Sequence, residues 1–334
     1  MSQQHKALLI HAKGARMELG TRPTPTPGAG QVLVRTIAVG LNPIDSYMQL
    51  VGFYITEDRL PVVPGCDGAG EVVKLGPDVH GWEIGDKVFY PGHMHNDRTT
   101  FQELVVVDSL RMAKIPTNIT PEQAATIPLG AGLTPPWAEG GRGKYAGKAA
   151  LVISGSGSVG QFALQLLKAS GFSPLIATAA KQNEEYCKAA GATHVIDHKE
   201  VPYADLPAAV KKIVGETPIA FVYDAWAKGE SQKAGFSLLA PGGAMATAMK
   251  AEVGLRAKDD ELGRRVVSPY GGTNEENHLD FSAEMYAHLT EMLEKGELKP
   301  NNVKLLEGGF EAIPAGCDEL LKGVSGVKLV ARVD

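Results

Sequence analysis

The sequence predicts an α/β protein with two domains, a β-rich domain of short strands and a domain with a doubly wound parallel sheet. Its 334 residues correspond to about two domains at roughly 150 residues each. Residues 1–115 contain short apolar segments separated by turn residues, and after residue 121 apolar strands alternate with helical stretches. Hydrophobic residues make up 44% and charged residues 21%, values that exclude a disordered or fibrous protein.

The amino-terminal part predicts a compact, barrel-like β domain. Glycine, proline and aspartate residues, including the proline-rich stretch 21–30, separate its apolar segments into short strands. The expected strands are 7–11, 31–39, 70–75, 86–90 and 101–107.

Strand–helix alternation predicts a parallel sheet with helices on its faces in the middle of the chain. The expected strands are 149–154, 174–179, 192–196, 219–224 and 243–248. A polar loop follows, and the tail then reads as helix, strand, helix and strand. These four elements are expected at 281–295, 303–306, 312–321 and 327–333.

Charge and cysteine content limit the possible partners and compartments. Lys and Arg number 33 and Asp and Glu 38, so the net charge of −5 gives no basic surplus for nucleic acid or a membrane surface. Cys66, Cys187 and Cys317 lie too far apart for a disulfide framework. Only residues 7–10 form an apolar run near the start, which is shorter than the ~7–15 residues of a secretory signal. We therefore expect a soluble, cytoplasmic protein.

The segment LVISGSGSVGQFALQLLKASG is the strongest local motif. An apolar strand leads into Gly155, Gly157 and Gly160, a G-x-G-x-x-G pattern, and an amphipathic helix follows. Glycines at such a turn let the backbone approach a pyrophosphate at the positive end of the helix, so the motif predicts dinucleotide binding. The expected contact residues are Gly155, Ser156, Gly157, Ser158, Val159 and Gly160.

The next strand indicates which dinucleotide binds. Enzymes that use NAD usually carry an acidic residue ~20 positions beyond the glycines, where it bonds the ribose 2′-hydroxyl. Here the strand ends at Thr178-Ala179-Ala180-Lys181 without an acid. Because Thr178 and Lys181 attract a 2′-phosphate, they favour NADPH.

Several further motifs carry a family resemblance that covers nearly the whole chain. They are VGLNPIDSYMQLVGFY, LPVVPGCDGAGEVVKLGPDV, GWEIGDKVFY, FQELVVV and GLTPPWAEG. With them the chain resembles the zinc-free branch of the medium-chain dehydrogenase/reductases. That branch includes the zeta-crystallin-like quinone oxidoreductases and the trans-acting enoyl reductases of polyketide assembly.

The resemblance implies a GroES-like β-barrel catalytic domain, formed by residues 1–120 and 271–334, and a Rossmann NADPH-binding domain at 121–270. It also implies an active site in the cleft between them. Zinc-dependent relatives need three protein ligands, and the matching positions hold Asn42, Cys66 and Leu129. One thiolate among three positions does not hold the metal, so we expect none.

The resemblance also implies roles for individual residues. Asn42 and Tyr47 match polar groups beside the nicotinamide and the substrate, with Tyr47 as a candidate proton donor. We expect Asp45 to cap a helix that starts near Ser46. Further cofactor contacts are expected from Asn42, Thr134, His198, Asp224, Thr247 and Lys328. The substrate pocket is expected to include Phe53, Tyr54, Tyr90, His93 and Tyr270.

Without a metal to polarise an alcohol or a simple ketone, hydride needs an acceptor that already stabilises negative charge. We therefore expect an NADPH-dependent reductase of an activated C=C bond, on a small or carrier-bound unsaturated carbonyl compound. An NADPH:quinone oxidoreductase is the alternative, and a non-catalytic NADPH-binding subunit of a synthase is an alternative from another class. A homodimer and a monomer are both compatible with the sequence.

Overall fold

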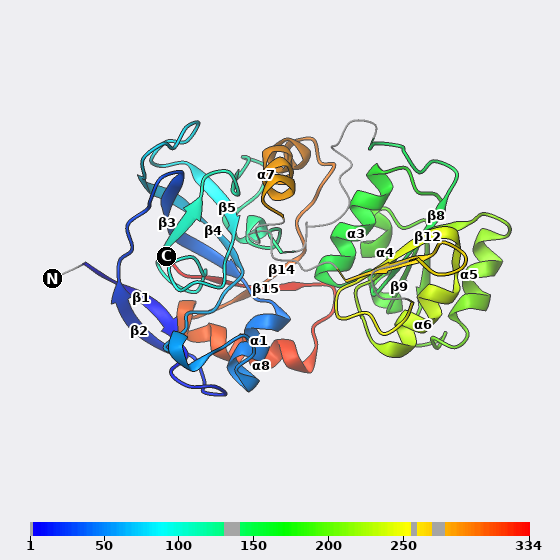
Figure 1. Cartoon of the computed structure of the whole chain (residues 1–334), viewed down its shortest axis with the longest axis horizontal. Helices are drawn as coiled ribbons and strands as arrows, with labels where there is room; N and C mark the ends of the chain where they lie inside the picture. The colour runs from blue at the N-terminus through cyan, green and yellow to red at the C-terminus, as the bar shows by residue number, and fades with distance from the viewer. Residues whose placement is uncertain (1–2, 130–140, 255–258, 269–277) are drawn as a thin grey trace. The chain divides into compact units, whose positions relative to one another are not determined.

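The computed structural model describes residues 3–129, 141–254, 259–268 and 278–334 (Figure 1). The chain forms two compact units. The first comprises 1–132, 272–296 and 300–334, and the second comprises 133–271 and 297–299. The short helix α2 (Pro121–Ala124), which we assigned to the nucleotide-binding segment, packs in the first unit against β3 and β4.

The first unit is built on a seven-stranded sheet whose main path runs β14-β15-β3-β4-β5-β7, with β6 paired to β3. Its pairs are antiparallel except β14–β15. A separate hairpin pairs β1 (Gln4–Leu9) with β2 (Glu18–Pro23). The sheet strands are β3 (Gln31–Gly40), β4 (Asp67–Leu75), β5 (Lys87–Pro91), β6 (Leu104–Asp108), β7 (Ala113–Lys114), β14 (Val303–Leu306) and β15 (Lys328–Arg332).

Helices of the first unit cover parts of this sheet and close its core. α1 and α8 pack against each other, and buried residues of both join β1 and β15 in one hydrophobic cluster. These helices are α1 (Pro43–Val51), α7 (Leu279–Glu294) and α8 (Ile313–Lys322), with 3-10 turns η1 (Glu57–Arg59) and η4 (Gly309–Ala312).

The second unit contains a six-stranded sheet in the order β10-β9-β8-β11-β12-β13, in which every pair is parallel. The order reverses between β8 and β11, which is the switch point of a doubly wound sheet. The strands are β8 (Ala149–Ile153), β9 (Leu175–Ala179), β10 (His194–Asp197), β11 (Ile219–Asp224), β12 (Leu239–Thr247) and β13 (Arg265–Val267).

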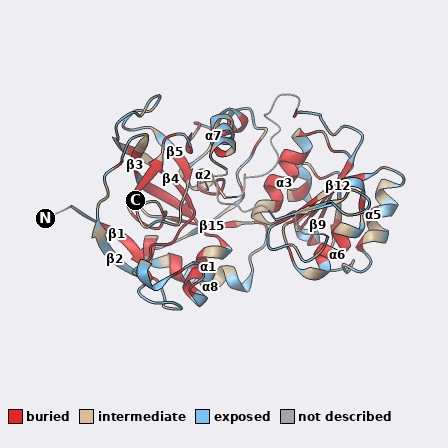
Figure 2. Ribbon diagram, viewed as in Figure 1, coloured by how far each residue is buried: buried red, intermediate tan, exposed pale blue. Residues whose placement is uncertain are grey.

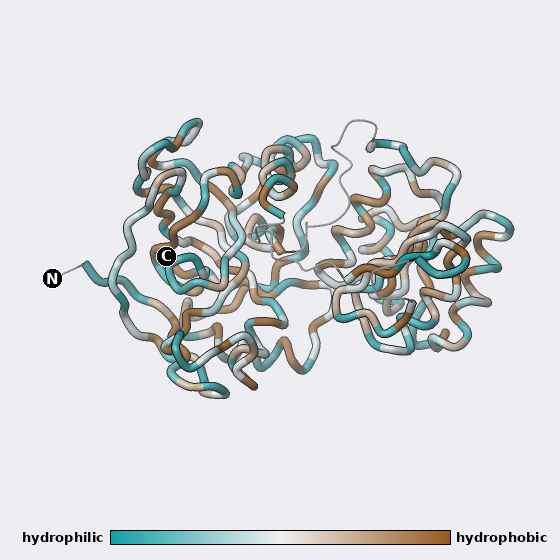
Figure 3. The backbone as a smooth tube through the Cα atoms, viewed as in Figure 1, coloured by the Kyte–Doolittle hydropathy of each residue, from teal (hydrophilic) through white to brown (hydrophobic). Residues whose placement is uncertain are grey.

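Helices cover both faces of this sheet, and the burial in Figure 2 and the hydropathy in Figure 3 follow that layering. One hydrophobic cluster joins the sheet to α3 (Ser158–Ala169) and α4 (Glu184–Ala190), and another joins it to α5 (Leu206–Val214) and α6 (Gly229–Ser237). All residues of β8 and β9 are buried, as expected for strands covered on two faces. The predicted fold class is confirmed.

Three local features differ from the sequence prediction. β2 lies partly in the stretch we read as a proline-rich connection. α1 begins at Pro43, three residues before the expected start. β12 begins at Leu239, because a register irregularity lets Pro241 and two glycines continue the strand.

Candidate functional site

The glycine-rich turn joins β8 to α3 in the second unit. Gly155, Ser156 and Gly157 form the turn, and Ser158, Val159 and Gly160 are the first three residues of the helix. The first N–H groups of a helix have no intrahelical acceptor, and the helix dipole makes this end positive. The turn therefore offers donors suited to a pyrophosphate.

The three glycines of this turn differ in how closely the surrounding atoms would approach an added Cβ. A Cβ at Gly160 would lie 2.2 Å from the Ser154 carbonyl oxygen, and one at Gly155 would lie 2.8 Å from Ala177 Cβ. Both positions thus need glycine for packing between helix and strands. A Cβ at Gly157 would meet its nearest atom at 3.3 Å, so protein packing constrains this position least. Glycine at 157 adds no side-chain atom at the helix start, which fits close approach of a dinucleotide.

Strand β9 supports the turn from the side. The backbone N–H groups of Ser154 and Gly155 donate to Thr178 Oγ1 at 3.0 Å and to the Thr178 carbonyl at 2.8 Å. Ser154 has φ +63, a left-handed conformation that non-glycine residues rarely adopt. Thr178 is buried, so the structure places this predicted 2′-phosphate contact beneath the turn.

The ends of β9 and β10 bring Lys181 and His198 to one edge of the sheet. Lys181 follows β9, His198 follows β10, and both are exposed. Asp197 lies between them, and its carboxylate accepts the backbone N–H groups of Lys181 at 3.3 Å and Lys199 at 2.9 Å. The sequence pattern did not mark this acid, because the acidic residue typical of NAD enzymes is expected at the end of β9, whereas Asp197 ends β10.

Asp224 and Thr247 end the paired strands β11 and β12 and are register partners. The buried Asp224 carboxylate accepts the N–H groups of Trp226 at 3.0 Å and Ala227 at 2.8 Å, and the Ser231 hydroxyl at 2.6 Å. Asp224 thereby shapes the turn into α6. Thr247 is also buried, and within the described residues its hydroxyl has no partner.

In the first unit, Asn42 and Lys328 meet at a buried polar cluster with Asp67. Asn42 Nδ2 donates to Asp67 Oδ2 at 2.9 Å, and Lys328 Nζ lies 2.8 Å from the same oxygen. Lys328 Nζ also donates to Asn42 Oδ1. Of these residues sequence reasoning missed Asp67, whose only signal was its place in the PGCDGAG motif.

Two further ionisable groups lie beside this cluster. The Asp45 carboxylate accepts the backbone N–H of Asn42 at 2.8 Å and so caps α1 from its third residue. Burial raises the pKa of Asp45 to about 7. Burial, together with the neighbouring Asp45 and Asp67 carboxylates, raises the pKa of Cys66 well above its ordinary value. Cys66 is therefore a protonated thiol at neutral pH.

Helix α1 and the loop after it carry the predicted aromatic residues. Tyr47, Phe53 and Tyr54 are exposed, and the rings of Phe53 and Tyr54 pack edge to face with centroids 4.4 Å apart. Arg59 donates to the carbonyl oxygens of Tyr54 and Met94. The Arg59 guanidinium thereby links the loop of Phe53 and Tyr54 to the loop that contains His93.

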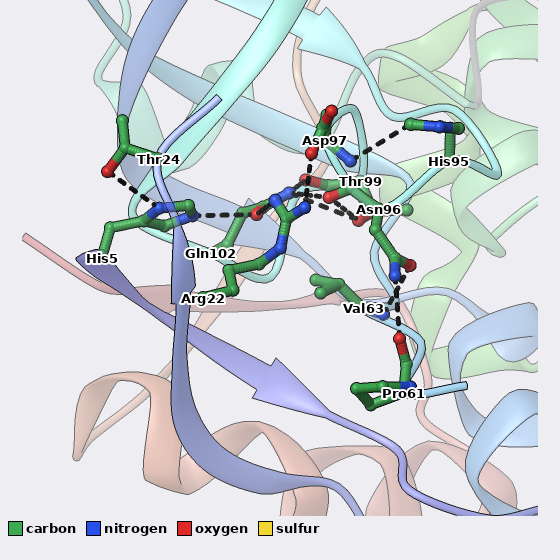
Figure 4. A network of polar contacts seen from close by, with 10 residues as sticks. All are labelled: His5, Arg22, Thr24, Pro61, Val63, His95, Asn96, Asp97, Thr99 and Gln102. Carbon is green, nitrogen blue, oxygen red and sulfur yellow. Dashed lines mark hydrogen bonds and ion pairs between the residues drawn. The ribbon is translucent and has the colours of Figure 1, made fainter. Parts of the chain in front are cut away.

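A polar network holds the loop 92–101 in place (Figure 4). The Gln102 amide is its centre: Nε2 donates to the carbonyls of Asn96 at 2.6 Å and Thr99 at 2.7 Å, and Oε1 pairs with His5 Nε2 at 3.0 Å and Arg22 at 2.8 Å. Both donors and both acceptor positions of the amide are thereby used. Burial lowers the pKa of His5, which keeps this ring neutral at neutral pH.

The remaining predicted residues have other locations. Tyr90 is fully buried in the core of the first unit, with its hydroxyl 3.1 Å from that of Thr36, so it offers no surface to a substrate. Thr134 and Tyr270 lie outside the described residues.

Among the described residues no three His, Cys, Asp or Glu side chains lie together as a metal site. None of the described helices has the length and apolar character needed to cross a bilayer.

Two family models match the chain. The model described as alcohol dehydrogenase GroES-like domain matches residues 28–117, and the one described as zinc-binding dehydrogenase matches residues 158–261. Similar curated proteins cover almost the whole chain. A trans-enoyl reductase from Pyricularia oryzae is 30% identical over 93% of each chain. A zinc-type alcohol dehydrogenase-like protein from Schizosaccharomyces pombe is 29% identical over 98% of this chain and all of the relative.

Solved structures share the fold. A quinone oxidoreductase from Coxiella burnetii superimposes with a TM-score of 0.75 at 24% identity, covering 99% of this chain and 100% of the other. An alcohol dehydrogenase superfamily protein from Novosphingobium aromaticivorans gives 0.81 at 24% identity over the same shares. These matches, the parallel sheet with its glycine-rich turn and the β-rich unit agree with the family resemblance in the sequence. The chain belongs to the medium-chain dehydrogenase/reductase family and is a nicotinamide-dependent oxidoreductase.

Proposed function

We propose that the protein is an NADPH-dependent, zinc-independent reductase of a C=C bond conjugated to a carbonyl group. The similarity to trans-enoyl reductases over nearly the full length of both chains is the observation that carries this proposal. The positions that match the zinc ligands of other family members support it. At these positions the Asn42 amide is hydrogen-bonded to Lys328 and Asp67, and the Cys66 thiol is protonated. Leu129 has an apolar side chain, and its backbone N–H donates to Asp67.

The residues of the second unit bind and orient the cofactor. The N-terminus of α3 holds the pyrophosphate through backbone donors, and Gly157 permits its approach. The exposed Lys181 pairs with the 2′-phosphate and so distinguishes NADPH from NADH. The Thr247 hydroxyl is a further hydrogen-bonding group at the carboxyl edge of the sheet, where dinucleotides bind in such folds.

The residues of the first unit serve the acceptor. When bound, the nicotinamide supplies a hydride to the β-carbon of the alkene. Tyr47, exposed on α1, gives the matching proton to the α-carbon and regains it from solvent. Asn42 and Lys328 orient polar groups of nicotinamide ribose or substrate, and Phe53 and Tyr54 contact the apolar part of the substrate.

NADPH oxidation with a conjugated enone as the only acceptor, followed by mass spectrometry of the product, tests the proposal. We expect the saturated ketone, two hydrogens heavier than the enone. Turnover of a quinone without turnover of the enone would instead establish quinone reduction. Activity only on a carrier-bound enoyl chain would identify the substrate as carrier-delivered. NADPH binding without turnover of any of these would favour a non-catalytic role.

A further inference from the structure

One buried carboxylate joins three separate segments of the first unit. Asp67 has no exposed surface, and it starts β4 directly after the turn at Gly65 and Cys66. Its Oδ2 accepts from Asn42, which precedes α1, and from Lys328, which starts β15. Its Oδ1 accepts the backbone N–H of Leu129 at 2.7 Å. A buried carboxylate is stable only when donors such as these pair with its oxygens.

This pairing determines the orientation of the Asn42 amide. An ammonium group only donates, so Lys328 faces Asn42 Oδ1, and an ionised carboxylate only accepts, so Asp67 faces Nδ2. Exchange of the amide oxygen and nitrogen would place donor against donor and acceptor against acceptor. Asn42 is 3% exposed, and its amide is therefore held in one orientation by two charges.

The backbone next to this cluster leaves room for it. A Cβ at Gly40 would lie 3.2 Å from both Asp67 Cβ and Lys328 Cε, and 2.4 Å from the Ala125 carbonyl oxygen. Glycine at position 40 thus lets the lysine stem reach the carboxylate. Within the described part of the chain, the Lys328 ammonium has two partners, Asn42 and Asp67, and three N–H bonds. Its third N–H has no acceptor among the described residues.

We propose that Asp67 is a positioning residue of the reductase: its ionised carboxylate fixes the Asn42 amide, the Lys328 ammonium and the backbone at Leu129 relative to one another. The inference rests on the proposed function in so far as Asn42 and Lys328 contact cofactor or substrate. Asp67 itself acts only through these neighbours, because it has no exposed surface and both of its carboxylate oxygens accept hydrogen bonds from the protein.

The isosteric variant Asp67→Asn tests this role. In one amide orientation its NH₂ faces the donors of Asn42 and Lys328, and in the other it faces the Leu129 N–H, so a donor–donor contact arises either way. We expect the NADPH dissociation constant, measured by titration calorimetry, to rise about tenfold or more, as for the loss of one charge-assisted hydrogen bond. We expect kcat/KM to fall with it, under conditions where circular dichroism shows a folded protein. Asp280→Asn, an exposed change at the start of α7, is the matched control and keeps the parent values.

A second variant separates positioning from plain stabilisation. Val72→Ala removes two methyl groups from the buried core of the same unit and leaves Asn42, Asp67 and Lys328 unchanged, so it lowers the melting temperature by another route. We expect it to keep the parental NADPH affinity and kcat/KM at temperatures where it is folded. An equal loss of NADPH affinity in Val72→Ala and Asp67→Asn would overturn the proposal, as would a folded Asp67→Asn protein with parental NADPH affinity and kcat/KM. The NADPH titration needs no acceptor, so its result stands apart from the enone and quinone assays of the parent protein.

Discussion

The Thr178 hydroxyl lies 3.0 Å from the backbone nitrogen of Ser154, and through this hydrogen bond β9 supports the turn that ends β8. The turn needs this support because Ser154 adopts a left-handed conformation without being glycine. The side chain of one strand thereby sets the geometry of the neighbouring dinucleotide-binding turn.

Replacement of Thr178 by valine keeps the side-chain shape but removes the acceptor for Ser154 N–H. An unsatisfied buried donor costs about 1–3 kcal/mol, so we expect a lower melting temperature and weaker NADPH binding. Thr178→Ser retains the hydroxyl and is the control. Equal melting temperatures and NADPH affinities of the valine and serine variants would show that the hydrogen bond does not stabilise the turn.

Replacement of Lys181 by alanine removes the exposed cation after β9. We expect KM for NADPH to rise about tenfold while KM for NADH stays constant, because only NADPH carries the 2′-phosphate. Lys211→Ala, at an exposed position of α5, is the matched control for loss of one positive charge. Parallel changes in both KM values would place Lys181 outside the 2′-phosphate site.

Replacement of Tyr47 by phenylalanine removes the proposed proton donor from α1. General acid catalysis contributes roughly 10²–10⁴-fold, so we expect kcat to fall by about 10²-fold with unchanged NADPH affinity. Tyr145→Phe, at a tyrosine that stacks on Phe172 before β8 and has no role in the proposed site, is the control and should keep the parental activity. If Tyr47→Phe turned over at the parental rate, water would be the proton source.

Asp45 is expected to make the stability of the protein depend on pH. Its folded-state pKa of about 7 exceeds its ordinary value of 3.8, so folding favours the protonated carboxyl. The resulting stability is full at low pH and is lost as the pH rises from about 4 to about 7. Between pH 5 and 8 the parent should therefore lose about 2–3 kcal/mol more than Asp45→Asn, a difference that urea unfolding measures. The reverse order would contradict the raised pKa.

The fold class followed from the sequence because continuous apolar strands and a glycine-rich turn are local patterns. β8 and β9 are buried on both faces, so nearly every residue is apolar and visible as such. β2 escaped prediction because its residues are mostly exposed and half polar, and only its pairing with β1 makes it a strand.

The candidate site was only partly predictable from the sequence. Asn42 and Lys328 were each recognised by resemblance, but their contact spans 286 positions and depends on Asp67, which no local pattern marks. Thr178 and Asp224 were assigned to the cofactor by their places at strand ends. Their side chains bind backbone N–H groups of adjacent turns, and such contacts depend on tertiary packing.

The Gln102 network couples the amino-terminal hairpin to a loop far along the sequence. Because His5 and Arg22 use the acceptor positions of the Gln102 amide, and Arg22 also pairs with Asp97, the hairpin and the loop 92–101 share one set of hydrogen bonds. A chimera that takes its first 25 residues from a homologue would therefore inherit a hairpin without its matching loop. A chimera that exchanges the hairpin and the loop 92–101 together would preserve these hydrogen bonds.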